Sequence, residues 1–245
     1  ALPIEQLEER AQNTHFPPDF AAALTNPGKP TPRLIAEIKQ RSPSKGMLRE
    51  PFDALPLAET YAHNGAAAIS VLTDEKYFGG CLGRLRMIHA LGLGLPLLRK
   101  DFIFDRYQLL EARAAGASAA LLIVAMLKQA ELAQLIAECN DLGLTPLVEV
   151  HDEAEFKRAL DAGACVIGIN NRNLHDFSVS LETSLRLVAQ CPEGILLVSE
   201  SGIKSQADIE CLGAAGVDAI LVGESLVTAE DVAEKVRSFT RVAVR

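Results

Sequence analysis

The sequence of 245 residues lacks the cysteine and histidine patterns that cross-link a fold or hold a metal. Its cysteines are odd in number and scattered, and they form no CxxC pair: Cys81, Cys139, Cys165, Cys191 and Cys211. This distribution favours reduced thiols in a cytosolic protein over a disulfide framework. The five histidines form neither an HExxH motif nor any other metal-ligand spacing. The sequence therefore predicts neither a disulfide framework nor a metal site.

Long apolar runs and an excess of basic residues are absent as well. The longest apolar run, Ala114–Leu127, is interrupted by Gly116 and Ser118 and is shorter than the roughly 20 residues that a membrane span needs. The N-terminus lacks the basic and then apolar pattern of a secretory signal. A formal net charge of -8 supplies no basic face for a nucleic acid or an anionic membrane, although a few local cations suffice for one small anion. We expect a cytoplasmic protein that binds neither.

What the sequence contains is a fourfold pattern in which a glycine follows a helix-like stretch and precedes an apolar run. Glycine is the usual residue just after the C-terminus of a helix. The four glycines are almost evenly spaced, at Gly65, Gly116, Gly163 and Gly216. The pattern predicts strands within Asn64–Leu72, Ala115–Val124, Ala162–Asn170 and Ala215–Gly223.

Four more apolar runs alternate with these, and each one follows a proline: Pro32, Pro96, Pro146 or Pro192. The segments between the runs have helical patterns, most clearly at 107–116 and 129–143. Apolar strands that alternate with helices are typical of parallel sheets covered by helices. Eight such units in about 250 residues match the count and size of a (β/α)₈ TIM barrel, in the α/β class.

A doubly wound open sheet is the competing fold. It usually carries a GxGxxG turn after its first strand, whereas the corresponding turn here, residues 41–46, reads RSPSKG. We therefore expect a single barrel domain over residues 1–245, with residues 1–30 forming a helix and a proline-rich connection packed on the barrel. Extra length at Gln40–Pro56 predicts a long first loop on the face where barrels carry their active sites.

Polar groups follow nearly every predicted strand, and the carboxyl ends of barrel strands converge on one mouth. Glu37 and Lys39 are two residues apart, so they share one face of a strand. Burying such charges is costly unless a ligand or a reaction uses them. The other strand ends carry Thr73, Lys100 and Asp101, Glu149, Asn170, Asn171 and Arg172, Glu200 and Ser201, and Gly223 and Glu224. The cluster of acids and lysines predicts an acid–base site, although Lys100 and Asp101 could instead form a structural ion pair.

The last two strands end in SESG, residues 199–202, and VGES, residues 222–225. Gly202 and Gly223 allow a ligand to approach the backbone closely, and the loops after the seventh and eighth strands of barrels commonly bind phosphate. We expect the carboxylate of Glu224 to point away from a phosphate, leaving its backbone N–H as the donor.

Five motifs closely resemble the indole-3-glycerol phosphate synthase family of tryptophan biosynthesis. They read IAEIKQRSPSKG, LLRKDFIFDRYQLLEARAAGA, LVEVHDEAE, GINNRNL and VSESGI, in this order, and the likeness extends from Leu34 to Val227. The resemblance implies a barrel with an extra N-terminal helical segment. It also implies a reaction without a cofactor, in which 1-(2-carboxyphenylamino)-1-deoxyribulose 5-phosphate is cyclised, decarboxylated and dehydrated to indole-3-glycerol phosphate.

The resemblance implies a role for each matching residue. Lys100 would be the general acid of ring closure, and Glu149 the acid–base partner in dehydration. Glu37 and Lys39 would assist, with Lys39 pairing with a substrate carboxylate or phosphate or acting as an acid in dehydration. Asn170 and Arg172 would orient the substrate, and Glu200 and Ser201 would complete the mouth. The phosphate would be held by Ser201, Gly202, Gly223 and Ser225 or the backbone beside it, which includes Glu224. Ser42 and Pro43 would shape the first loop, and Phe102 would pack on the anthranilate ring.

The sequence departs from the family pattern before Leu34, where no likeness is recognisable, and at Cys81, where a serine is expected. Three alternatives stay open. Lys100 or Lys39 could form a Schiff base, as in class I aldolases. Phosphoribosylanthranilate isomerase is a related barrel, but its cysteine and aspartate are replaced by Glu37 and Glu149. A non-catalytic phosphosugar binder would lack catalytic groups that are present here. We expect a monomer whose partner is a small phosphosugar–anthranilate substrate.

Overall fold

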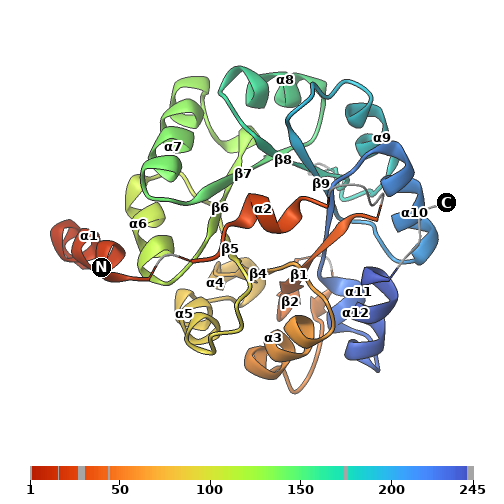
Figure 1. Cartoon of the computed structure of the whole chain (residues 1–245), viewed down its shortest axis with the longest axis horizontal. Helices are drawn as coiled ribbons and strands as arrows, with labels where there is room; N and C mark the ends of the chain where they lie inside the picture. Colours follow the sequence, from red (N-terminus) through yellow and green to blue (C-terminus); the bar gives the residue numbers. More distant parts are fainter. Residues whose placement is uncertain (1, 16, 27–30, 44, 174–175, 242–245) are drawn as a thin grey trace.

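The computed structural model describes residues 2–15, 17–26, 31–43, 45–173 and 176–241. Within them, eight parallel strands close into a barrel (Figure 1): β1 (Arg33–Ile38), β4 (Ala68–Leu72), β5 (Leu97–Lys100), β6 (Ala119–Ile123), β7 (Thr145–Val150), β8 (Val166–Asn170), β9 (Leu196–Glu200) and β10 (Ala219–Val222). Each strand pairs with the next along the chain, and β1 pairs with both β4 and β10 to close the ring. The predicted (β/α)₈ barrel and its eight strands are confirmed.

Helices surround the strands: α3 (Ala54–His63), α5 (Leu82–Ala90), α6 (Arg106–Ala114), α7 (Gln129–Asp141), α8 (Glu153–Asp161), α9 (Glu182–Val188), α10 (Gln206–Ala215) and α12 (Val232–Thr240). The short helices α4 (Glu75–Phe78) and α11 (Glu224–Val227) and the 3₁₀ turn η1 (Val124–Met126) lie in the loops. Within the described residues, no helix is long and apolar enough to cross a membrane.

Local sequence explains where the helices begin and end. Aspartate or serine side chains accept hydrogen bonds from first-turn N–H groups at Asp53, Asp105, Asp152, Ser205 and Asp231. The four repeated glycines all have positive φ angles of 84–100°, a region in which a side chain is strained. The glycine pattern in the sequence therefore marks the turns that lead from a helix into the next strand.

Side chains alternate between the barrel interior and the helical layer. On β5, Leu98 packs inside the barrel, whereas Leu97 packs outward in the core between strands and helices. The interior is filled by Ile35, Ala68, Leu98, Ala119, Leu121, Ile123, Leu147, Val166, Val198, Ala219 and Leu221. Every second residue of a strand points to the same face. The residue two positions after the last interior residue of a strand therefore points into the C-terminal mouth.

Two helices precede the barrel where the sequence predicted one. Helix α1 (Ile4–Asn13) packs through Leu7 and Ala11 against Leu110 of α6. Helix α2 (Phe20–Leu24) lies across the centre of the barrel in Figure 1, and both Phe20 and Leu24 are fully buried among the interior side chains. Residues 1, 16 and 27–30 of the predicted extension lie outside the described residues.

The long first loop differs from its prediction in two ways. It contains a small antiparallel hairpin of β2 (Arg41–Ser42) and β3 (Gly46–Met47), and it ends at Asp53 because α3 starts at Ala54. Pro56 therefore lies in the first turn of α3, where the missing N–H of proline removes no helical hydrogen bond. Ser44 lies outside the described residues. Arg49 Nη1 donates to the carbonyl oxygens of Val227 and Ala229, at 3.1 and 3.4 Å, which ties the loop to the segment at α11.

Replacing Phe20 with alanine is expected to lower the free energy of unfolding by about 3–5 kcal/mol, because the change empties a fully buried site beneath the barrel. Equilibrium urea denaturation measures this loss. Phe104→Ala is the matched control, since that ring is 65% exposed and its loss should change the free energy by no more than about 0.5 kcal/mol. Equal losses in the two variants would contradict a packed role for α2.

Candidate active site

One ammonium group and three carboxylates meet at the C-terminal mouth of the barrel. Lys100 Nζ of β5 lies 3.7 Å from Glu37 Oε1 of β1 and 3.9 Å from Glu149 Oε2 of β7, and it donates a hydrogen bond to Glu200 Oε2 of β9. The Lys100 side chain is 15% exposed and that of Glu200 only 1%. Charges buried this deeply persist only when they neutralise one another.

Lys39 and Glu37 share one face, as the sequence predicted. Lys39 Nζ lies 2.6 Å from Glu37 Oε2, so the Glu37 carboxylate sits between two ammonium groups. Burial by itself would raise the pKa of Glu37. The charges of Lys39 and Lys100 outweigh burial and hold that pKa below its usual value. Glu37 is therefore an anion at neutral pH.

Two glycines make room for the carboxylates. A Cβ atom on Gly168 of β8 would overlap Glu200 Oε1, and a Cβ atom on Gly223 would overlap Glu37 Oε2. Gly223 is thus a spacer beside Glu37 as well as a residue at the end of β10. Gly168 was not predicted as a site residue, although it lies two residues before Asn170 on β8 and therefore points to the same face.

Glu149 has two further partners. Asn170 Nδ2 donates to Glu149 Oε1 at 3.2 Å, and His151 Nε2 lies 3.3 Å from the same oxygen in an ion pair that is not aligned as a hydrogen bond. His151 was not predicted as a site residue. It lies two residues after Glu149 and therefore on the same face, just as Lys39 lies two residues after Glu37.

The buried charges shift one another's pKa values in opposite directions. Burial would raise the pKa of Glu149, but His151, Lys100 and Asn170 hold it below its usual value. Burial raises the pKa of Glu200 to about 7, and the anions Glu149 and Glu37 add to that rise against the opposing charge of Lys100. Burial would lower the pKa of Lys100, yet the carboxylates around it raise it strongly. Near neutral pH, Lys100 is charged and Glu200 is close to its titration point.

Asp101 does not belong to this cluster. Its Oδ2 accepts from Thr73 Oγ1 at 2.5 Å and from Arg99 Nη2 at 3.0 Å, on the helical side of the barrel. The suggested structural ion pair between Lys100 and Asp101 is therefore wrong, because neighbouring strand residues point to opposite faces. Thr73 and Asn171 are likewise structural, and the buried Asn171 amide bonds to Ser184 and Ser199.

The ends of β9 and β10 form one side of the rim. Ser201 and Gly202 both have positive φ angles, 66° and 84°. Ser225 Oγ donates to the carbonyl oxygen of Ile203 at 2.9 Å, so this hydroxyl joins the two loops. Glu224 Oε1 pairs with Lys45 Nζ at 2.6 Å, which directs its side chain toward the first loop.

The other predicted residues also lie around the rim. The ring of Phe102 contacts those of Tyr77 and Phe78, with centroid distances of 6.0 and 6.4 Å. In the first loop, Ser42 is buried and its Oγ accepts from the N–H of Lys45, whereas Pro43 is exposed. After β8, Arg172 Nη1 donates to the carbonyl oxygen of Phe177 at 3.3 Å.

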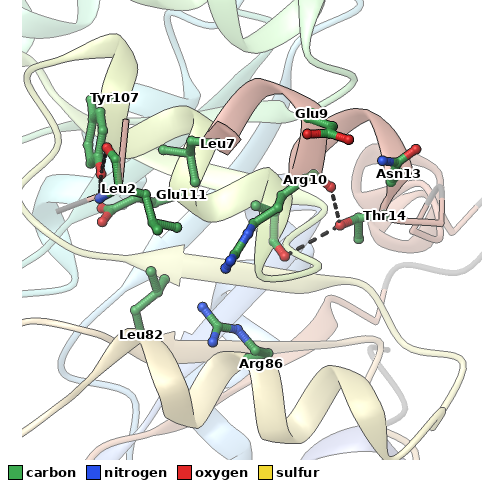
Figure 2. A pocket seen from close by; sticks show the side chains of 11 residues that line it. Leu2, Leu7, Glu9, Arg10, Asn13, Thr14, Leu82, Arg86, Tyr107 and Glu111 are labelled. Atoms are coloured by element: carbon green, nitrogen blue, oxygen red, sulfur yellow. Dashed lines mark hydrogen bonds between the residues drawn. The ribbon is translucent and has the colours of Figure 1, made fainter. Parts of the chain in front are cut away.

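A cleft of about 800 Å³ lies away from the mouth, between α1 and helices α5 and α6 (Figure 2). Leu7, Leu82 and Tyr107 supply its apolar wall, and Arg10 and Arg86 reach into it from opposite sides. None of the predicted site residues lines this cleft. The convergence of buried charges, rather than cavity size, therefore identifies the candidate active site. Among the residues described, no group of histidine, cysteine, aspartate and glutamate is arranged to hold a metal ion.

Replacing Glu200 with glutamine is expected to make stability less sensitive to pH. Between its ordinary pKa of 4.5 and about 7, folded Glu200 retains a proton that the unfolded chain has released, so parent stability falls as pH rises through this range. From pH 5 to pH 8 the variant should gain about 2 kcal/mol relative to the parent. Urea denaturation at both pH values measures the difference. The exposed Glu182→Gln control should show no such trend, and a pH-independent difference for Glu200→Gln would contradict the raised pKa.

Comparisons with known proteins agree with the geometry. The family model described as indole-3-glycerol phosphate synthase matches residues 1–239. Proteins with that name from Roseiflexus sp. (strain RS-1) and Dehalococcoides mccartyi (strain CBDB1) are 54% and 48% identical to this chain. The matches cover 96% of the chain in both cases and 90% and 91% of the relatives.

Solved structures resemble the chain in fold alone. A 3-hexulose-6-phosphate synthase superposes with a TM-score of 0.70 at 17% identity, over 86% of this chain and 99% of that one. Thiamine phosphate pyrophosphorylase from Pyrococcus furiosus gives a TM-score of 0.64 at 17% identity, over 86% and 94%. The match of the family model over almost the whole chain, together with relatives about half identical, shows that this chain belongs to the indole-3-glycerol phosphate synthase family.

Proposed function

We propose that the chain converts 1-(2-carboxyphenylamino)-1-deoxyribulose 5-phosphate into indole-3-glycerol phosphate, carbon dioxide and water. The observation that carries this proposal is the buried Lys100 ammonium amid three carboxylates at the barrel mouth. The reaction needs a proton donor at a carbonyl oxygen and a base at a carbon, and this cluster contains both. The family to which the chain belongs supports the same reaction.

Lys100 is the general acid of ring closure in this proposal. The surrounding carboxylates keep it protonated, so the proton is in place when the substrate binds. Attack of the aromatic ring carbon on the substrate carbonyl turns the carbonyl oxygen into an alkoxide. An alkoxide is a stronger base than an amine, so Lys100 can donate its proton even with a raised pKa. Loss of carbon dioxide then returns the bonding electron pair to the ring and restores aromaticity.

Glu149 acts in the dehydration that follows. Its lowered pKa leaves the carboxylate free to accept a proton from carbon. The proton then reaches the departing hydroxyl, which leaves as water, so Glu149 ends the cycle ionised. Lys100 regains its proton from solvent, which balances the proton consumed when a carboxylate is lost as carbon dioxide. Glu37 and Lys39 assist at the same face of the mouth, and Lys39 binds an anionic group of the substrate as a rim cation.

The other residues bind and orient the substrate. Phe102, beside Tyr77 and Phe78, packs on the anthranilate ring. The loops after β9 and β10 hold the phosphate, where glycine lets an anion approach the backbone. Ten further residues complete the proposed substrate-binding and catalytic site: Ser42, Pro43, Asn170, Arg172, Glu200, Ser201, Gly202, Gly223, Glu224 and Ser225. We propose that the protein acts as a monomer with a single domain.

The charge of Lys100 also bears on the Schiff-base alternative. A lysine that attacks a carbonyl must lose its proton first, and catalytic lysines of this kind have a depressed pKa. The pKa of Lys100 is instead raised, and Lys39 is paired with Glu37. Treatment with borohydride in the presence of the substrate should therefore trap no covalent adduct, and a trapped adduct on Lys100 would favour the aldolase-like reaction.

The roles of Lys100 and Glu149 can be tested by following the fluorescence of the indole product. Lys100→Met removes the proton and the charge, whereas Lys100→Arg keeps the charge on a group that does not release its proton. Both variants should lower kcat by a factor of about 10²–10⁴, as should Glu149→Gln. Lys157→Met, at an exposed position of α8, is the matched control and should retain full activity.

Two outcomes would contradict this assignment in different ways. Turnover that survives in Lys100→Arg would show that charge, rather than proton donation, is what the lysine supplies. A parent protein that binds the substrate without turning it over would instead be a phosphosugar-binding protein, and the proposed reaction would be wrong.

Gly168→Ala tests the spacing of the site. The added Cβ must displace the Glu200 carboxylate, and with it the hydrogen bond to Lys100. Because a shift of about 1 Å can slow catalysis about a hundredfold, we expect a loss of that size in kcat. Gly83→Ala, in helix α5, is the control, since a Cβ there would lie 3.9 Å from Cys81 Sγ, an ordinary van der Waals distance. It should retain activity, and an equally active Gly168→Ala enzyme would show that Glu200 needs no fixed position.

A further inference from the structure

One imidazole ring joins the barrel mouth to helix α8. His151 follows the last residue of β7, and its side chain is 12% exposed. Nε2 lies 3.3 Å from Glu149 Oε1, and Nδ1 lies 2.9 Å from Glu155 Oε2 in the first turn of α8. The ring therefore lies between two carboxylates, one in the catalytic cluster and one in the first turn of α8.

The backbone fixes this arrangement. Glu155 Oε2 accepts a hydrogen bond from the N–H of His151 at 2.8 Å as well as from its ring. Asp152 caps α8 by accepting from the N–H of Glu155 at 2.8 Å, which fixes the start of the helix. A carboxylate on one ring nitrogen sets the position of the proton and the orientation of the ring. Nδ1 is therefore a donor to Glu155, and Nε2 is directed at Glu149.

The charges around Glu149 give the ring a reason to be cationic. Glu149 lies near the Glu37 carboxylate of β1, the partly ionised Glu200 of β9 and one cation, Lys100 of β5, which all three acidic side chains share. The His151 ring is nearer to Glu149 than Lys100 is.

The other charged groups near the ring are acidic. Glu155 is the carboxylate that α8 presents to it, and Asp152 is engaged in the helix cap. Burial would lower the pKa of His151, but Glu149 and Glu155 raise it to about 10. The ring thus carries a positive charge at neutral pH.

We propose that His151 is a positioning residue: its imidazolium orients the Glu149 carboxylate and keeps it ionised, with Glu155 as the outer counter-ion. This inference rests on the proposed role of Glu149 as the base of dehydration. A neutral amide at residue 151 would remove this ion pair and leave Glu149 beside two acidic side chains with only the shared Lys100 charge.

His151→Gln tests this role through the pH dependence of turnover. The acidic limb of the kcat/KM profile should move up by about one pH unit, because Glu149 becomes easier to protonate. At pH 7, kcat should fall about tenfold because Glu149 loses the group that orients it. The KM should stay within about twofold of the parent value, since the substrate contacts are unchanged. His63→Gln, at an exposed position of α3, should leave the profile unchanged. A His151→Gln profile that superimposes on that of the parent would overturn the proposal.

A second measurement is independent of turnover. The ¹⁵N signals of the histidine rings of the full chain should show that His151 remains protonated at pH 8, well above the ordinary pKa of about 6.5. Glu155→Gln should lower this pKa by at least about one unit, and Glu149→Gln should do the same. A His151 ring that titrates near 6.5 in the parent would overturn the proposal.

These measurements separate the two hypotheses. If Glu149→Gln retains turnover while His151 of the parent has a raised pKa, the base assignment fails and the ion pair stands. If Glu149→Gln is inactive but His151 titrates normally, the base assignment stands and the positioning role fails. Should His151→Gln not fold, Glu155→Gln supplies the pH profile, because the Asp152 cap of α8 remains in place.

Discussion

The ammonium of Lys100 is the constraint on which the mouth of this barrel depends. Three buried carboxylates face it, and without its charge they would repel one another where little water reaches them. Lys39 and His151 add positive charge at the edges of the cluster, against Glu37 and Glu149 respectively. The positive charge is shared unequally among the three carboxylates. Glu37 and Glu149 each have a second cation and remain ionised. Among the described residues Glu200 pairs with Lys100 alone, and it titrates near neutral pH.

The apolar floor beneath the cluster strengthens these interactions. The inward residues immediately before the charged layer are Ile35, Leu98, Leu147 and Val198, and α2 closes the barrel below them. A low local dielectric increases both the attraction of opposite charges and the cost of an unpaired one. The same packing that stabilises the barrel therefore sets the pKa values at its mouth.

Much of this arrangement follows from the sequence, because the period of a strand is two. That rule places Glu37 beside Lys39 and directs Lys100, Glu149, Asn170 and Glu200 into the mouth. Applied consistently, it also separates Lys100 from Asp101 and brings His151 to the face of Glu149. Sequence could not supply which strand ends lie opposite one another, since that depends on barrel closure and stagger. The plug formed by α2 was missed for a related reason, because it depends on contacts with strands far along the chain. The hairpin in the first loop was missed as well, although its two short strands are close in the sequence.

The glycines show how closely packing and chemistry are linked in this fold. Gly168 and Gly223 are inward positions at which any side chain would occupy the volume of a carboxylate. A barrel of this size fills its interior with side chains. A functional group therefore fits only where the neighbouring strand has a glycine, which carries no side chain. The polar layer is therefore specified by two kinds of residue, those that carry charge and those that leave room for it. A motif search that scores only charged residues detects the first kind. The second kind is recognised once the strands are placed in register, because Gly168 lies beside β9 and Gly223 follows the strand that pairs with β1.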